Sequence, residues 1–430
     1  MNSYPIKHGL FVNKRSLYLI ATVGVLSAPS QMISLLGVLF FILFVMKDLS
    51  FGERKFSIYI FISVSVISLV FHSFYTGVSQ FVKSFVFFLF ISPFLVYSFS
   101  VNRRGEYFSE DFIKRFIEVY FIIQALFCFL SILITVAAGR FTGFDTDFGD
   151  VVAGSFRNPL VLTQDTANKS FSFLTILLLY YYISQFRQSV NVVLVLVMVG
   201  LVFLASVTHL TLFAVLALCI SKFKLNKYFL FAVLSAFLTL FLYKYLQPVN
   251  FRLINERLEL VLSTLGNLEN LYLIGDKGEY LYNFIITSKD EFFRLLTVGF
   301  GHGNYSSRAS ILLVGGFGSS GILDVSKEMM SNTYPLLQEF LTKPLWQRGA
   351  FYFPYNDFVS LLAELGGVCF FILLFSFARR LIGMFSNRDA VFYFSFIILA
   401  SLVDHYIEYF APLAVFFILI ISRKKCEKFG

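Results

Sequence analysis

The chain has 430 residues, of which 57% are hydrophobic and only 14% are charged, and its mean hydropathy is +0.76. Apolar runs that approach membrane-spanning length recur along it, so the composition predicts a polytopic membrane protein without a separate soluble domain. The net charge of +9 does not indicate nucleic-acid binding, because the basic residues fall in short clusters beside apolar runs. The four cysteines lie in apolar spans or in the C-terminal tail, where they form neither a disulfide framework nor a zinc site. We expect no metal and no other cofactor.

The positions of the apolar runs predict an all-α fold of about twelve transmembrane helices. The first two runs are short and are separated by Pro29, which predicts a tight hairpin of helices. The expected spans are residues 16–28, 31–46, 56–72, 84–100, 116–138, 169–185, 190–206, 208–221, 228–246, 355–377, 390–403 and 409–421.

The basic clusters predict the orientation of the spans. With about twelve spans, all the clusters and both termini fall on one side, which the positive-inside rule makes cytoplasmic. The chain then divides into a transmembrane part (1–246), a large periplasmic loop with short amphipathic helices (247–354), and the last spans with a cytoplasmic tail (355–430). The large loop is expected between the ninth and tenth helices, and any chemistry is expected on the outer face.

The long hydrophilic segment contains a glycine-rich stretch and leads into a returning apolar helix. In residues 298–305 glycine alternates with other residues, so the backbone can turn sharply and present its amides to a ligand. Asn356 and Asp357 follow Pro354 and open an apolar run, which is typical of a helix N-terminus. Asp357 and Glu364 are two helical turns apart, so they are expected to share one face of that helix.

These features together resemble the O-antigen polymerase and O-antigen ligase superfamily of bacterial envelope glycosyltransferases. The family pattern is an arginine-bearing helix, a Gly-x-Gly turn, and a short His/Asn-initiated helix that ends in Leu-x-Glu-x-Gly. The matching segments are Glu256–Leu260, Val298–Gly303, and Asn356 with Leu362–Gly366. Tyr355 stands where the family has a histidine. Because a ligase depends most on that histidine, its replacement favours a polymerase.

The resemblance implies a GT-C-like fold in the bacterial inner membrane and metal-independent glycosyl transfer at its periplasmic face, in lipopolysaccharide biosynthesis. An undecaprenyl diphosphate-linked glycan is the donor, a hydroxyl of a second lipid-linked unit attacks its anomeric carbon, and undecaprenyl diphosphate leaves. The resemblance also leaves room for a chain-length regulator protein as a partner. Two further departures are Tyr280 in place of an arginine before the glycine stretch, and Thr208-His209 in place of Ser-Arg.

A diphosphate leaving group calls for fixed positive charge and directed N–H donors, which the planar guanidinium of arginine supplies well. Each arginine could instead be solvated or form a surface ion pair. His209 could equally be a hydrogen-bonded histidine between helices, and Asn356 could be a helix cap. The residues expected to bind substrate or diphosphate are Arg257 and Arg308 as first choices, then Arg294, Arg252, Arg157, His209, Gly299, Gly301, Gly303 and Asn356.

His302 and Glu364 are the expected catalytic-site residues. His302 lies between two glycines, on what we expect to be an exposed turn, where it could act as an acid or base near neutral pH or be an ordinary loop histidine. Glu364 lies within an apolar run, which is costly unless the carboxylate is paired, and we expect it to anchor the glycine stretch. Asp404, His405 and Glu408 could supply a base, but we expect them to form a structural network.

Three other functions compete with a polymerase. A ligase of the same superfamily would transfer finished polymer to lipid A-core. A transporter or flippase would need polar groups spread through the spans and a cytoplasmic linker at the midpoint, and the sequence has neither clearly. A membrane scaffold would not need a glycine-rich turn beside loop arginines.

Overall fold

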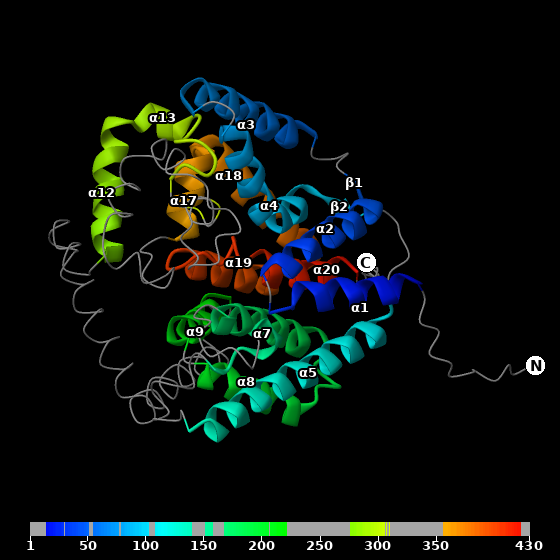
Figure 1. Cartoon of the computed structure of the whole chain (residues 1–430). Helices are drawn as coiled ribbons and strands as arrows, with labels where there is room; N and C mark the ends of the chain where they lie inside the picture. The colour runs from blue at the N-terminus through cyan, green and yellow to red at the C-terminus, as the bar shows by residue number, and fades with distance from the viewer. Residues whose placement is uncertain are drawn as a thin grey trace, which may run out of the picture.

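The computed structural model describes residues 14–29, 31–50, 55–76, 79–102, 108–139, 151–157, 167–205, 207–221, 276–305, 307, 309 and 356–422. The predicted all-α class is confirmed over these residues (Figure 1). The one exception among them is a short antiparallel pair of strands, β1 (Leu49–Ser50) and β2 (Val101–Asn102).

The N-terminal helices follow the predicted apolar runs, and polar caps help to start two of them. The side chains of Ser109 and Asn191 accept hydrogen bonds from the backbone amides of Phe112 and Leu194, at the starts of α5 and α8. The helices are α1 (Lys14–Leu26), α2 (Gln31–Asp48), α3 (Lys55–Thr76), α4 (Ser79–Phe99), α5 (Glu110–Ala137), α7 (Ala167–Gln185), α8 (Val192–Leu204) and α9 (Thr208–Ser221), with a 3-10 turn η2 at Gly154–Phe156.

The C-terminal half contains shorter helices than the sequence predicts. The expected single span 355–377 is wrong: the helix ends at Leu365, and a new one begins at Gly367. Gly366 has a φ of 77°, a left-handed conformation that glycine adopts readily and that breaks the helix. The helices are α12 (Asp276–Asp290), α13 (Phe292–Leu296), α17 (Asp357–Leu365), α18 (Gly367–Met384), α19 (Asn387–Ser401) and α20 (Phe410–Ile421). The expected span 228–246 lies outside the described residues.

Helix α20 is the centre of the bundle, because every one of its residues is buried. It packs against α1, α2, α4 and α7 (Figure 1). Aromatic side chains fill the space between these helices: the rings of Tyr97 on α4 and Phe417 on α20 stack with centroids 4.1 Å apart. A helix with no polar face can be enclosed by protein or by lipid, and α20 is enclosed by protein.

The apolar helices indicate a membrane protein. Four of the described helices are long and apolar enough to cross a membrane, namely those at Phe56–Phe74, Gln80–Phe99, Glu110–Ala137 and Gly367–Met384. Large apolar side chains on the outside of α3 and α5 are strongly exposed, such as Phe74 at 82% and Leu133 at 65%. Hydrophobic surface of this kind is costly in water and is suited to lipid.

The ends of the helices divide into two sets. The strand pair β1–β2, the start of α1 and the end of α20 lie on one side of the bundle, whereas α12, α13 and α17 lie on the opposite side (Figure 1). The backbone amide of Phe108 donates to the carbonyl of Ser422, which ties the start of α5 to the end of α20 on the first side. The residues on the second side form the candidate site.

Candidate functional site

The glycine turn, residues 298–305, packs directly on the junction of α17 and α18. The amide of Phe300 donates to the carbonyl of Ala363 over 2.7 Å. Gly299 has a φ of 67°, and a Cβ there would lie 2.5 Å from the Ala363 carbonyl oxygen and 2.6 Å from the amide nitrogen of Gly366. Close backbone packing therefore requires glycine at both position 299 and position 366. The glycine turn and the junction of α17 with α18 therefore form one structural unit.

Glu364 anchors this unit, as the sequence predicts. Its carboxylate is fully buried and accepts hydrogen bonds from three backbone amides: that of Gly303, that of Tyr305 at 3.1 Å and that of Ser307 at 2.8 Å. A carboxylate that accepts several backbone N–H bonds is stabilised in its charged form. Glu364 is thus held in place by the backbone that it positions.

Two of the helices that are long and apolar enough to cross a membrane, α3 and α4, hold the turn from the other side, through residues that the sequence analysis missed. The side chain of Gln80 on α4 donates to the backbone carbonyl of His302 over 2.9 Å and accepts from the side-chain amide of Asn304 over 2.8 Å. The ammonium of Lys83 donates to Asn304 Oδ1 over 3.1 Å, and Ser68 on α3 donates to the carbonyl of Val298 over 2.7 Å. The sequence signal for these contacts was the set of polar residues at positions 80, 83 and 84 beside an apolar run. It was missed because the predicted span began only at residue 84, which left residues 80 and 83 outside the helix.

His302 is buried, which corrects the expectation of an exposed turn histidine. Its ring stacks on that of Phe87, with centroids 5.5 Å apart, and its Nδ1 lies 3.2 Å from Ser84 Oγ. Burial, with a smaller contribution from His72, lowers the pKa of His302 to about 3. The imidazole is therefore neutral at physiological pH, so acid–base chemistry near pH 7 does not fit it as placed here.

The buried imidazole of His302 predicts a pH dependence of stability. Its pKa is about 3 in the folded chain and 6.5 when unfolded, so the unfolded state binds more protons between these values. The free energy of unfolding therefore carries no penalty from His302 above pH 6.5. It falls as the pH drops below 6.5, by about 2 kcal/mol at pH 5. We expect melting in detergent at pH 7.5 and 5 to show a smaller loss for His302→Phe than for wild type. Equal losses would contradict the burial of a neutral imidazole.

Of the two predicted binding arginines among the described residues, Arg294 lies beside the glycine turn. Its guanidinium lies 5.3 Å from the centroid of the Phe300 ring and pairs with Glu291 at 2.8 Å. One of its terminal nitrogens lies 3.4 Å from Nε2 of His72. About a third of its side chain is exposed. Arg294 therefore forms a surface ion pair and lies at the exposed edge of the glycine turn.

The other predicted binding residues lie elsewhere. Arg157 is buried beside η2, which packs on α5 and α7. Nε2 of His209 lies 2.7 Å from the hydroxyl of Tyr406, so it is a hydrogen-bonded histidine between α9 and the segment before α20. Asn356 caps α17 by accepting from the amide of Val359 over 2.8 Å. Arg252, Arg257 and Arg308 lie outside the described residues.

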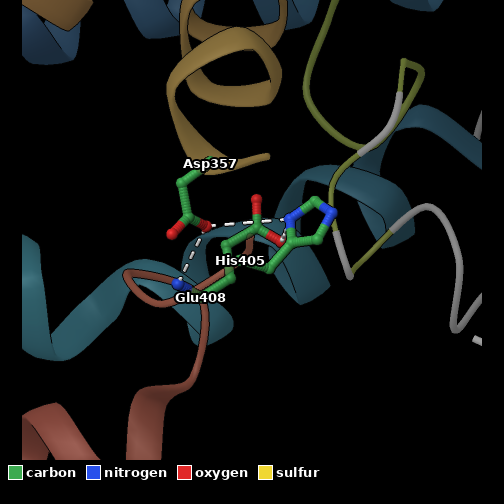
Figure 2. A group of neighbouring side chains, drawn as sticks. All are labelled: Asp357, His405 and Glu408. Carbon is green, nitrogen blue, oxygen red and sulfur yellow. Dashed lines mark hydrogen bonds and ion pairs between the residues drawn. The ribbon is translucent and has the colours of Figure 1, made fainter. Parts of the chain in front are cut away.

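A second group of charged side chains meets at the start of α17. Asp357, His405 and Glu408, which we call the carboxylate–histidine cluster, are all buried and point toward one another (Figure 2). Nδ1 of His405 lies 3.7 Å from Asp357 Oδ1 and 3.4 Å from Glu408 Oε2. The neighbouring Asp404 pairs with Lys169 on α7. The network predicted for Asp404, His405 and Glu408 is confirmed, with Asp357 and Lys169 as further members.

The charge state of His405 follows from these neighbours. Burial alone would lower its pKa, but the nearby carboxylates of Asp357 and Glu408 outweigh burial and raise the pKa to about 9. Asp357 also accepts hydrogen bonds from the amides of Ile407 and Glu408. The cluster therefore ties the start of α17 to the segment between α19 and α20, while Glu364 ties its end to the glycine turn.

In comparisons with protein-family models, with curated proteins and with solved structures, nothing matches this chain. The functional argument therefore rests on the residues and their geometry.

Proposed function

We propose that the protein is an O-antigen-type polymerase, which joins undecaprenyl diphosphate-linked repeat units at the periplasmic face of the bacterial inner membrane. The observation that carries the proposal is the union of the glycine turn with α17. The segments that resemble the family lie far apart in sequence, yet Phe300 bonds to Ala363 and Glu364 holds the amides of Gly303 and Tyr305. A polar backbone turn built at one end of an apolar bundle suits an amphiphilic substrate.

In the proposed reaction a hydroxyl oxygen of the acceptor unit forms a bond to the anomeric carbon of the donor glycan. The bond from that carbon to the diphosphate breaks, undecaprenyl diphosphate leaves, and the hydroxyl proton passes to a base. Arg294 is placed to attract the leaving diphosphate at the edge of the turn, together with Arg257 and Arg308 as implied by the resemblance. We assign Glu364 and His302 to positioning the turn, since His302 is buried within it and Glu364 on α17 is buried against it.

The proposed topology has about twelve spans, a GT-C-like arrangement and both termini in the cytoplasm. It predicts that a cysteine at position 320, in the large loop, reacts with a membrane-impermeant maleimide added to intact spheroplasts. The probe belongs in a variant without the four native cysteines. A cysteine placed in the 423–430 tail is the matched control and should react only after permeabilisation. The reverse pattern would invert the topology and remove the proposed reaction from the periplasm.

The glycans of a deletion strain test the function itself. Loss of a polymerase should leave core with a single repeat unit and no ladder of longer chains. Polymer that accumulates on the lipid carrier would instead identify a ligase, and unchanged glycans would contradict both. Complementation by the wild-type chain, at matched membrane levels, completes the test.

A further inference from the structure

The carboxylate–histidine cluster has the composition of a metal site. Asp357, His405 and Glu408 offer two carboxylates and one imidazole, and their ligand atoms all lie within 4.8 Å of one another (Figure 2). Ligands that surround one divalent ion at about 2.0–2.2 Å are separated by distances of this order. The three residues come from two parts of the chain, the start of α17 and the segment between α19 and α20. Their sequence spacing therefore gave no metal signature.

The structure also holds these groups in place, as a metal site requires. The carboxylate of Asp357 accepts from the amides of Ile407 and Glu408, the second at 3.2 Å. The backbone amide of His405 donates to Asp404 over 2.8 Å, and Asp404 in turn pairs with Lys169. Asp404 is thus engaged with a lysine, which separates it from the three converging groups.

We propose that Asp357, His405 and Glu408 bind a single divalent transition-metal ion inside the bundle. Two carboxylates and a neutral imidazole carry a formal charge of −2, which a divalent cation balances, and in a buried site such balance is strongly favoured. A mixed oxygen and nitrogen ligand set suits Zn²⁺ or Mn²⁺ better than Ca²⁺ or Mg²⁺. On binding, the ion takes the place of the proton on His405.

The bound ion has a structural consequence that does not depend on the proposed function. It crosslinks the N-terminus of α17 to the segment that precedes α20, the central helix. Since Glu364 fixes the other end of α17 to the glycine turn, the ion would set the position of the whole α17–turn unit. This role leaves the proposed glycosyl transfer metal-independent.

Metal binding to the purified full-length protein in detergent tests the inference. The free Mn²⁺ signal in electron paramagnetic resonance should fall until one equivalent is bound, and Zn²⁺ should displace that Mn²⁺. Glu408→Gln and Asp357→Asn should each weaken binding by about 10- to 100-fold. Asp389→Asn is the matched control, because Asp389 is a buried carboxylate at the other end of α19, bonded to Tyr180 and Ser386. It should bind Mn²⁺ as the wild type does.

Spectroscopy of the wild-type protein tests the metal site even if a variant fails to fold. Electron spin echo spectra of the bound Mn²⁺ should show coupling to an imidazole nitrogen, from His405. Mn²⁺ that stays free at millimolar concentration, bound Mn²⁺ without nitrogen coupling, or a folded Glu408→Gln protein with wild-type affinity would each overturn it. The first result would leave the protonated imidazole as the cation of the cluster.

Discussion

Glu364→Gln should destabilise the protein and abolish most polymer formation. The substitution keeps the size of the side chain but removes its charge and replaces one carboxylate oxygen by an NH₂ group, which cannot accept a hydrogen bond. Either the amide of Gly303 or the amides of Tyr305 and Ser307 then lose their acceptor. A buried amide left without its acceptor costs about 1–3 kcal/mol. We expect a clear drop in melting temperature in detergent and a loss of long glycans at normal membrane levels.

Glu291→Gln is the matched control for this change. Glu291 also pairs with a charged group near the turn, but its side chain is 35% exposed, so its ion pair with Arg294 contributes little. We expect melting within experimental error of wild type. If Glu364→Gln were as heat-stable and as active as wild type, Glu364 would not be the anchor of the turn.

Gly299→Ala should separate the glycine turn from α17 and lower both stability and activity. The backbone conformation of Gly299, with φ of 67°, costs an L-residue about 1–2 kcal/mol. The added Cβ would also meet the Ala363 carbonyl oxygen at 2.5 Å, a backbone atom that can move only if α17 moves. We expect the turn to separate from α17, with loss of polymer and a lower melting temperature.

Gly383→Ala provides the comparison, because a Cβ at this helical glycine of α18 meets nothing within 4 Å. Alanine is favoured over glycine within a helix, so this variant should be as stable as wild type or slightly more stable. Equal melting of the Gly299 and Gly383 variants would contradict the close packing of the glycine turn on α17.

Local sequence patterns predicted the parts of the site that depend on short-range chemistry. The start of α17 followed from Asn356 and Asp357, and the buried pairing of Glu364 followed from the cost of a carboxylate in an apolar run. Within the described part of the large loop, the expected short amphipathic helices correspond to α12 and α13. In each case the signal lies in neighbouring residues of the chain, although the partners of Glu364 lie in the distant glycine turn.

Contacts between distant segments were not predictable in this way. Gln80 and Lys83 meet the glycine turn more than two hundred residues later, and Lys169 meets Asp404 across a similar gap. The burial of His302 depends on Phe87 and Ser84 of α4, which its own glycine neighbours do not reveal. The break at Gly366 was missed because apolar residues continue on both sides of it.

The central claim is that this chain by itself joins lipid-linked repeat units. The most direct measurement uses the purified protein in liposomes with undecaprenyl diphosphate-linked repeat units from its own strain. Gel analysis of the lipid-linked products should show a ladder of glycans that grows with time, and the Glu364→Gln protein should give none. If the wild-type protein leaves every repeat unit as a monomer, while its membrane fraction extends the same substrate, the account is contradicted.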